Sequence, residues 1–151
     1  MEIPQWIKDS CIHQKATEPE DFIGMTMAWY FSLTFNGFIN QACILTLFKL
    51  VNHNLGMEFR KTEVTFLSDD GAGTHYGLKP EFIERQLQLL IDAWNEEVVR
   101  GEDNITPEEF YQQFEEIHPC EDGNGRVGAI LYNCMKASLF DPIHPPAFKR
   151  R

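Results

Sequence analysis

The chain has 151 residues, 43% of them hydrophobic, and a formal net charge of −10. This length fits one domain with its own core, and no apolar run is long enough for a membrane-spanning helix. The negative charge argues against a nucleic-acid partner, which would need a broad basic surface. A local site for a small anion, such as a nucleotide, remains compatible with it.

The start of the chain and the cysteine pattern indicate a cytoplasmic protein with no membrane partner. Met1 is followed by Glu2 and Pro4 rather than by a basic segment and an apolar stretch, so no secretory signal is expected. No CxxC spacing relates the four cysteines, Cys11, Cys43, Cys120 and Cys134. Buried free thiols are therefore expected rather than disulfides.

The first third of the chain predicts two helices. Residues 1–20 are polar and are expected to be irregular, with one short turn near Trp6. A helix is predicted from Pro19 to Leu33, where acidic residues come first and apolar residues recur at the helical period. A second, more apolar helix should run from about Phe38 to Asn52 and be central.

The remainder predicts a small hairpin and three more helices. Strand formers alternate with charges from Glu58 to Leu67, and a loop follows from Ser68 to Gly73. An amphipathic helix opens at Lys79-Pro80-Glu81. The next helix should run from Thr106, as N-cap, to about Ile117. The last should run from near Gly125 to about Ser138.

These elements indicate an all-α, single-domain helical bundle with a small β-hairpin. We divide the chain into an N-terminal segment of residues 1–20, a domain of residues 21–140 and a proline-rich basic tail of residues 141–151. The basic ending, Lys149-Arg150-Arg151, is expected to be solvated.

The connection between the last two predicted helices combines several groups that could handle a phosphate. It reads His118-Pro119-Cys120-Glu121-Asp122-Gly123-Asn124-Gly125-Arg126. Two glycines allow the backbone to approach a ligand closely, and the following helix offers free N–H groups and its positive dipole end. Arg126 adds a guanidinium suited to phosphate oxygens. Asp122 is a hard oxygen ligand for Mg²⁺, and His118 can accept a proton near neutral pH.

This loop resembles the signature of the Fic family, HxFx(D/E)GNGRxxR. His118, Pro119 and the run from Asp122 to Arg126 stand at matching positions. The segment from Phe59 to Phe66, with the loop and long helix after it, resembles the family's flap hairpin and following helix. The order of elements from about residue 20 to 140 also suits the family's all-α core.

The resemblance implies a protein adenylyltransferase that moves AMP, or another nucleoside monophosphate, from ATP or another NTP to a Ser, Thr or Tyr hydroxyl of a target protein. His118 would be the base and Arg126 would contact phosphate, so both are catalytic candidates. Gly123, Asn124 and Gly125 would line the anion hole with Arg126, and Asp122 would hold Mg²⁺. The flap would dock the target's main chain as an added strand, through residues Arg60, Lys61, Thr62 and Val64.

Two positions depart from the family pattern. Cys120 stands where the family has a loop-anchoring Phe, so the loop could be looser, or Phe114 could fill the space; a packing role for this thiol is preferred to a reactive one. Ala129 replaces the second arginine, which in AMP-transferring members fixes the γ-phosphate end of ATP. Doc-type kinases also lack that arginine, but they usually carry Lys where this chain has Gly125.

These departures leave two alternatives beside AMP transfer: a Doc-like protein kinase, or a degenerate fold that binds a nucleotide or a protein without catalysis. The family's inhibitory motif, [S/T]xxxE[G/N], fails at its glutamate position after Thr17, Ser68, Thr106 and Ser138. An inhibitor of that kind would be a separate chain, as in toxin–antitoxin pairs, or would be missing. A ligand-free capping loop and a Cys/His metal site are weaker readings of the same segment, and His75 and Tyr76 are secondary target-binding candidates.

Overall fold

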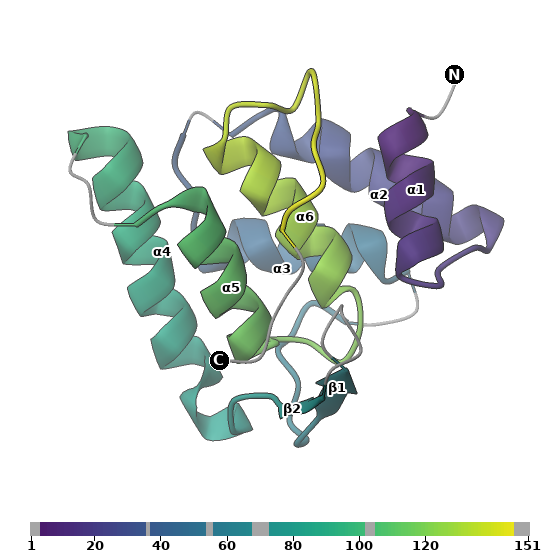
Figure 1. The fold of residues 1–151 in the computed structure, drawn as a ribbon. Coiled ribbons are helices and arrows are strands. Elements are labelled where there is room, and N and C mark those ends of the chain that lie inside the picture. The colour runs from purple at the N-terminus through teal and green to yellow at the C-terminus, as the bar shows by residue number, and fades with distance from the viewer. Residues whose placement is uncertain (1–3, 36, 54–55, 68–72, 102–104, 147–151) are drawn as a thin grey trace.

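Six α-helices and one short hairpin make up the described part of the chain, residues 4–35, 37–53, 56–67, 73–101 and 105–146, in this computed structural model (Figure 1). The helices are α1 Gln5–His13, α2 Pro19–Ser32, α3 Gln41–Val51, α4 Ile83–Arg100, α5 Pro107–Ile117 and α6 Asn124–Met135. Strand β1 (Thr65–Leu67) pairs antiparallel with β2 (Thr74–Tyr76), and a 3₁₀ turn, η1 (Pro80–Phe82), leads into α4. The predicted all-α class with a small hairpin is confirmed.

Local capping explains why the helices begin where they do. Asp21 Oδ2 accepts a hydrogen bond from the Glu18 N–H (3.1 Å) at the start of α2. Thr106 Oγ1 accepts one from the Glu109 N–H (3.1 Å) at the start of α5. Asn40 caps α3 in the same manner, so that helix starts at Gln41 rather than at Phe38 as predicted. Side-chain caps satisfy donors that the first helical turn leaves without partners.

The prediction that residues 1–20 are irregular is wrong, because residues 5–13 form α1. Ile7 and Cys11, one turn apart, are fully buried in the main core. The helix packs against α2 and α6 (Figure 1). The N-terminal segment is therefore part of the bundle and lies beside the helix that starts at the candidate site.

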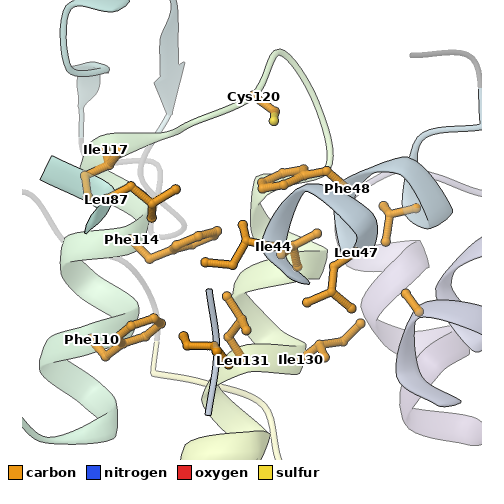
Figure 2. Close-up of a cluster of buried hydrophobic side chains, with 14 of the residues drawn as sticks. Ile44, Leu47, Phe48, Leu87, Phe110, Phe114, Ile117, Cys120, Ile130 and Leu131 are labelled. Atoms are coloured by element: carbon orange, nitrogen blue, oxygen red, sulfur yellow. The ribbon is translucent and has the colours of Figure 1, made fainter. Parts of the chain in front are cut away.

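Helix α6 is the enclosed centre of the fold, a place that the sequence had suggested for α3. It packs against α1, α2, α3 and α5, and most of its residues are buried. Side chains of α3, α4, α5 and α6 meet in one apolar cluster beneath the α5–α6 loop, where Figure 2 shows Phe48, Phe110, Phe114 and Ile130. This cluster gives the loop a rigid base.

The segment after α6 folds back onto that helix. Asn133, fully buried, donates from Nδ2 to the Ile143 carbonyl (2.9 Å) and accepts from the Ile143 N–H (2.9 Å). The predicted basic ending and most of the predicted hairpin loop, residues 68–72, lie outside the described residues. None of the helices in the described ranges has the length and apolarity needed to cross a membrane.

Candidate active site

The candidate loop runs from the residue that follows α5 to the first turn of α6. His118 caps the end of α5 in the left-handed region (φ 49°, ψ 63°), with its N–H donated to the Phe114 carbonyl at 3.0 Å. Gly123, the residue before α6, has φ 84°, which glycine adopts without steric cost. These two turns place the imidazole of His118 and the N-terminus of α6 at opposite ends of one short loop.

Asn124 holds the loop closed with its side chain. Its Nδ2 donates to the Cys120 carbonyl (2.8 Å) and its Oδ1 accepts from the Cys120 N–H (3.1 Å), and the residue is only 2% exposed. The side chain is therefore committed to the loop itself. The part of Asn124 that can face an anion is its backbone N–H, which together with those of Gly125 and Arg126 has no partner within the helix.

Asn52, at the C-terminal end of α3, is a supporting residue that the sequence analysis missed. Its Nδ2 donates to the Asp122 carbonyl at 2.6 Å, and the side chain is buried. Asp122 in turn accepts the Gly123 N–H on Oδ1 (2.8 Å) while 76% of its side chain stays exposed. Asn52 thus holds the backbone of Asp122, while the Gly123 N–H orients its carboxylate, which stays open to a cation. Its position fits the predicted Mg²⁺ ligand.

Arg126 lies in the first turn of α6 with only 3% of its side chain exposed. Its Nη1 is 3.8 Å from Asp21 Oδ1, and its Nη2 is 3.6 Å from Asp122 Oδ1. Both separations exceed a hydrogen bond, and Nε and Nη1 make none within the described residues. A buried guanidinium with unused donors beside a helix N-terminus is a strong feature of an anion site.

The imidazole of His118 is largely buried, with the ring of Phe66 from β1 stacked on it at 4.2 Å between centroids and 8° between planes. Burial, and after it the charge of the nearby Arg60 guanidinium, lowers the pKa of His118 from 6.5 to about 4. The Glu115 backbone and the Asp122 charge oppose that shift. The imidazole is therefore neutral at neutral pH, which is the form that accepts a proton.

The flap residues divide into two groups. Arg60 is only 4% exposed, and its guanidinium donates to backbone carbonyls of the loop and the hairpin, so its side chain is not free to contact a target. Lys61 and Thr62 are exposed and Val64 is half-buried, just before β1. Docking by these three stays a prediction, and Arg60 has to be removed from the set as a side-chain contact.

The sequence model of the Fic/DOC family matches residues 38–135, which include α3 to α6, the hairpin and the whole loop. The chain belongs to the Fic/DOC family. This membership accounts for the loop, because the residues from His118 to Arg126 fall inside the matched region.

Solved structures of Fic proteins share the fold. A Fic-domain signalling protein from Bacteroides thetaiotaomicron superposes with a TM-score of 0.66 at 20% identity, covering 83% of this chain and 51% of that one. A Fic family protein from Desulfovibrio desulfuricans gives 0.62 at 16% identity, covering 91% and 43%. Fic-1 from C. elegans gives 0.59 at 22% identity, covering 90% and 44%. This Fic/DOC chain thus spans about half the length of these proteins or less.

Gln14, one residue past α1, is the second site residue that the sequence analysis missed. A Cβ placed on Gly125 would stand 2.5 Å from Gln14 Oε1, so the amide lies against the first turn of α6. Gln14 follows Ser10 at the spacing of the family's inhibitory motif, with glutamine in place of glutamate and with Lys15 (φ 57°) in place of Gly or Asn. The spacing from Ser10 to Gln14 can be read from the sequence, but the sequence analysis did not predict the helix α1 that brings Gln14 to α6.

Ala129 lies one turn after Gly125 on α6, in the wall of a pocket of about 420 Å³. The other walls come from α1, α5 and the segment after α6 and include Asp9, His13, Gln14 and His144. None of the described lining residues is a lysine or an arginine. The place of the family's second arginine is therefore open space beside the anion site, bordered by a carboxylate.

Cys120 leaves a cavity where the family has phenylalanine. The cavity, about 110 Å³, is lined by Cys120, Phe48, Phe59 and neighbouring residues; Figure 2 shows Cys120 above Phe48. Phe114 is not among the lining residues, so the expectation that it fills the space is not met. Burial raises the pKa of the Cys120 thiol to about 12, which favours a packing role. Among the described residues, no three metal-ligating side chains gather into a Cys/His site.

Proposed function

We propose that this Fic/DOC protein transfers AMP, or another nucleoside monophosphate, from a nucleotide to a Ser, Thr or Tyr hydroxyl of a target protein. One observation carries the proposal. A neutral imidazole, a helix N-terminus, a buried guanidinium with unused donors and an exposed carboxylate belong to a single loop, His118 to Arg126. A base, an anion site and a metal ligand are the parts that phosphoryl transfer needs.

In the proposed reaction the target hydroxyl oxygen attacks the α-phosphorus. The bond from that phosphorus to the bridging oxygen breaks, pyrophosphate leaves, and the hydroxyl proton passes to a nitrogen of His118. A pKa of about 4 makes the free imidazole a weak base. Phosphates bound beside it would raise that pKa, because an adjacent negative charge favours the protonated form.

The chain's own groups would hold the phosphates. Backbone N–H groups of Asn124, Gly125 and Arg126 face the anion. Arg126 would exchange its long contacts with Asp21 and Asp122 for shorter bonds to phosphate oxygens. Asp122 would hold Mg²⁺, which proteins commonly bind through one or two carboxylates together with substrate phosphates. When bound, the cation neutralises charge on the phosphates.

The test is transfer of label to protein. The purified chain is incubated with Mg²⁺ and ATP labelled on the α-phosphate, with a lysate as the source of targets, beside His118→Ala and the control Arg85→Met at an exposed position on α4. We expect labelled bands with wild type and Arg85→Met and none with His118→Ala. Equal labelling by His118→Ala would refute the assignment of His118 as the base.

A protein kinase is the second candidate, and the pocket beside Ala129 favours it. The triphosphate tail would need to lie near Gly125, but the pocket there presents Asp9 and no described lysine or arginine. A nucleotide bound in the reverse direction would place its γ-phosphate near His118 instead. Label on the γ-phosphate, run in parallel, separates the two reactions.

A non-catalytic binding module is the third candidate, motivated by Cys120 and Ala129 together. ATP–Mg²⁺ affinity without turnover on any target would favour it. For both transferase candidates the expected protein target docks on the flap at Lys61, Thr62 and Val64. Inhibition by a separate chain is the corresponding proposal for regulation, because Gln14 lacks the charge of the motif's glutamate.

A further inference from the structure

The buried guanidinium of Arg60 joins two parts of the molecule that are far apart in sequence. Nε donates to the His118 carbonyl (2.6 Å), and Nη2 donates to the Ile117 carbonyl (3.0 Å). On the hairpin side, Nη1 donates to the Thr62 carbonyl (2.8 Å) and Nη2 to the Leu78 carbonyl. One side chain thus binds the end of α5 and both ends of the flap.

Backbone contacts reinforce the same junction. The Arg60 N–H donates to the Pro119 carbonyl (3.0 Å), and the Leu78 N–H donates to the Glu116 carbonyl (3.3 Å). The last carbonyls of a helix have no partner within the helix. Here the flap supplies those partners, and most of them come from Arg60. The end of α5 that carries His118 is therefore capped by the flap.

The flap also reaches the other side of the base. Phe66 stacks on the imidazole of His118, and His75, the β2 partner of Phe66, also stacks on the Phe66 ring (centroids 5.3 Å, planes 18°). His118 itself is in the left-handed region, which is uncommon for residues other than glycine. The hairpin consequently contacts His118 at its carbonyl and at its ring.

We propose that Arg60 is a positioning residue that joins the flap to His118, so that a displacement of the flap displaces the base. Arg60 contacts neither target nor nucleotide in this scheme. It holds the His118 carbonyl while the same flap holds the imidazole through Phe66. The effect of Arg60 on catalysis rests on the proposed function, whereas the link that Arg60 makes between the flap and His118 does not.

An arginine suits this position for geometric reasons. Its planar fork reaches several carbonyls at once, which an ammonium on a flexible stem cannot do. Burial of the charge lowers the pKa of Arg60, although hydrogen bonds to four carbonyls compensate the guanidinium for lost water. Lysine would keep the charge and lose most of these bonds. The pair Arg60→Lys and Arg60→Met therefore separates charge from geometry.

The experiment uses NMR and hydrogen exchange on the full chain, with Arg85→Met, an exposed arginine on α4, as the matched control. We expect the contact between the Phe66 ring and the His118 imidazole, seen as a nuclear Overhauser effect, to persist in wild type and Arg85→Met. In Arg60→Lys and Arg60→Met it should fall at least threefold. Exchange of the amides of Gly77 and Leu78 should rise at least tenfold in both, while core amides of α6 keep their wild-type rates.

Each outcome decides the proposal. An unchanged ring contact and unchanged flap exchange in Arg60→Lys would overturn it, and so would exchange that rises equally in α6, since that marks a general loss of stability. If Arg60→Met does not fold, Arg60→Lys decides alone. In label transfer, we expect kcat to fall about a hundredfold in Arg60→Lys with KM for ATP within about threefold. No transfer by wild type would refute the proposed function. The NMR and exchange results would then test by themselves whether Arg60 joins the flap to His118.

Discussion

The side-chain amide of Gln14 lies against the backbone of Gly125 at the first turn of α6. The two residues are brought together because α1 packs on α6. Gly125 is the point where a phosphate would need to approach the helix N-terminus most closely. A neutral amide at this place partly covers the anion site without supplying a competing charge.

The charge of the side chain at position 14 should therefore set how tightly the nucleotide binds. Gln14→Glu places a carboxylate at the positive end of α6, where it competes with phosphate, and we expect ATP–Mg²⁺ to bind about tenfold more weakly. Gln14→Ala uncovers the site, and we expect binding to tighten by about threefold. Isothermal titration calorimetry of each variant with ATP–Mg²⁺ measures both changes.

The matched control is Gln5→Ala, which removes the same type of side chain from the other end of α1. Gln5 donates to Asp9 within α1 at 2.9 Å, so its loss should leave the affinity within about twofold of wild type. Equal affinities for Gln14→Glu and Gln14→Ala would show that charge at this position has no influence on the anion site.

The cavity beside Cys120 predicts a stabilising substitution. Cys120→Phe would place a ring in about 110 Å³ of empty space between Phe48 and Phe59. We expect the free energy of unfolding to rise by about 1 kcal/mol. Cys120→Ala enlarges the same cavity and should lower it by about 1 kcal/mol. Urea denaturation of the three proteins measures this, and destabilisation by both changes would mean that the loop cannot accept the ring.

The sequence predicted the parts of the site that are local in the chain. Caps such as Thr106 and the glycine at 123 act on neighbouring residues, so helix starts and the loop's conformation follow from short segments. The candidates His118, Asp122 and Arg126 were named correctly as neighbours because one loop carries them all. Their chemical roles remain predictions.

The supports of the loop could not be predicted, because they come from remote segments. Asn52 reaches Asp122 across 70 residues of sequence, and Arg60 reaches His118 across 58. An asparagine after a helix reads as an ordinary C-cap, and an arginine beside a lysine reads as surface charge. Only packing shows that both are buried. For α1 a signal existed, since Ile7 and Cys11 are one turn apart, but a helix this short is weakly marked.

Restoring the family's second arginine should raise the affinity for a triphosphate. Ala129→Arg would extend a guanidinium into the pocket of about 420 Å³ beside Gly125, where Asp9 could orient it. We expect about 30-fold tighter ATP–Mg²⁺ binding, corresponding to roughly 2 kcal/mol for one charge-assisted contact. Calorimetry with ATP and with AMP measures the gain, which should be absent for AMP. Ala129→Met controls for side-chain length, and an equal gain with Met would refute a charge effect.

The lowered pKa of His118 predicts how stability changes with pH. In the unfolded chain the imidazole titrates near 6.5, whereas in the fold its pKa is about 4. Between these values the unfolded state binds a proton that the folded state does not, so stability falls as pH falls from about 6.5 towards 4. His118→Gln cannot take up that proton. The free energy of unfolding of His118→Gln, relative to that of wild type, should therefore rise by roughly 2 to 3 kcal/mol between pH 7 and pH 4.5.

Urea midpoints of wild type and His118→Gln at pH 7, 5.5 and 4.5 measure this difference. The comparison cancels contributions from the other titrating groups, because both proteins share them. NMR titration of the His118 ring gives the folded pKa independently and should show the neutral form at pH 5.5. A difference that stays constant from pH 7 to 4.5 would mean that the imidazole titrates alike in both states, and that Arg60 and burial do not act on it as the geometry indicates.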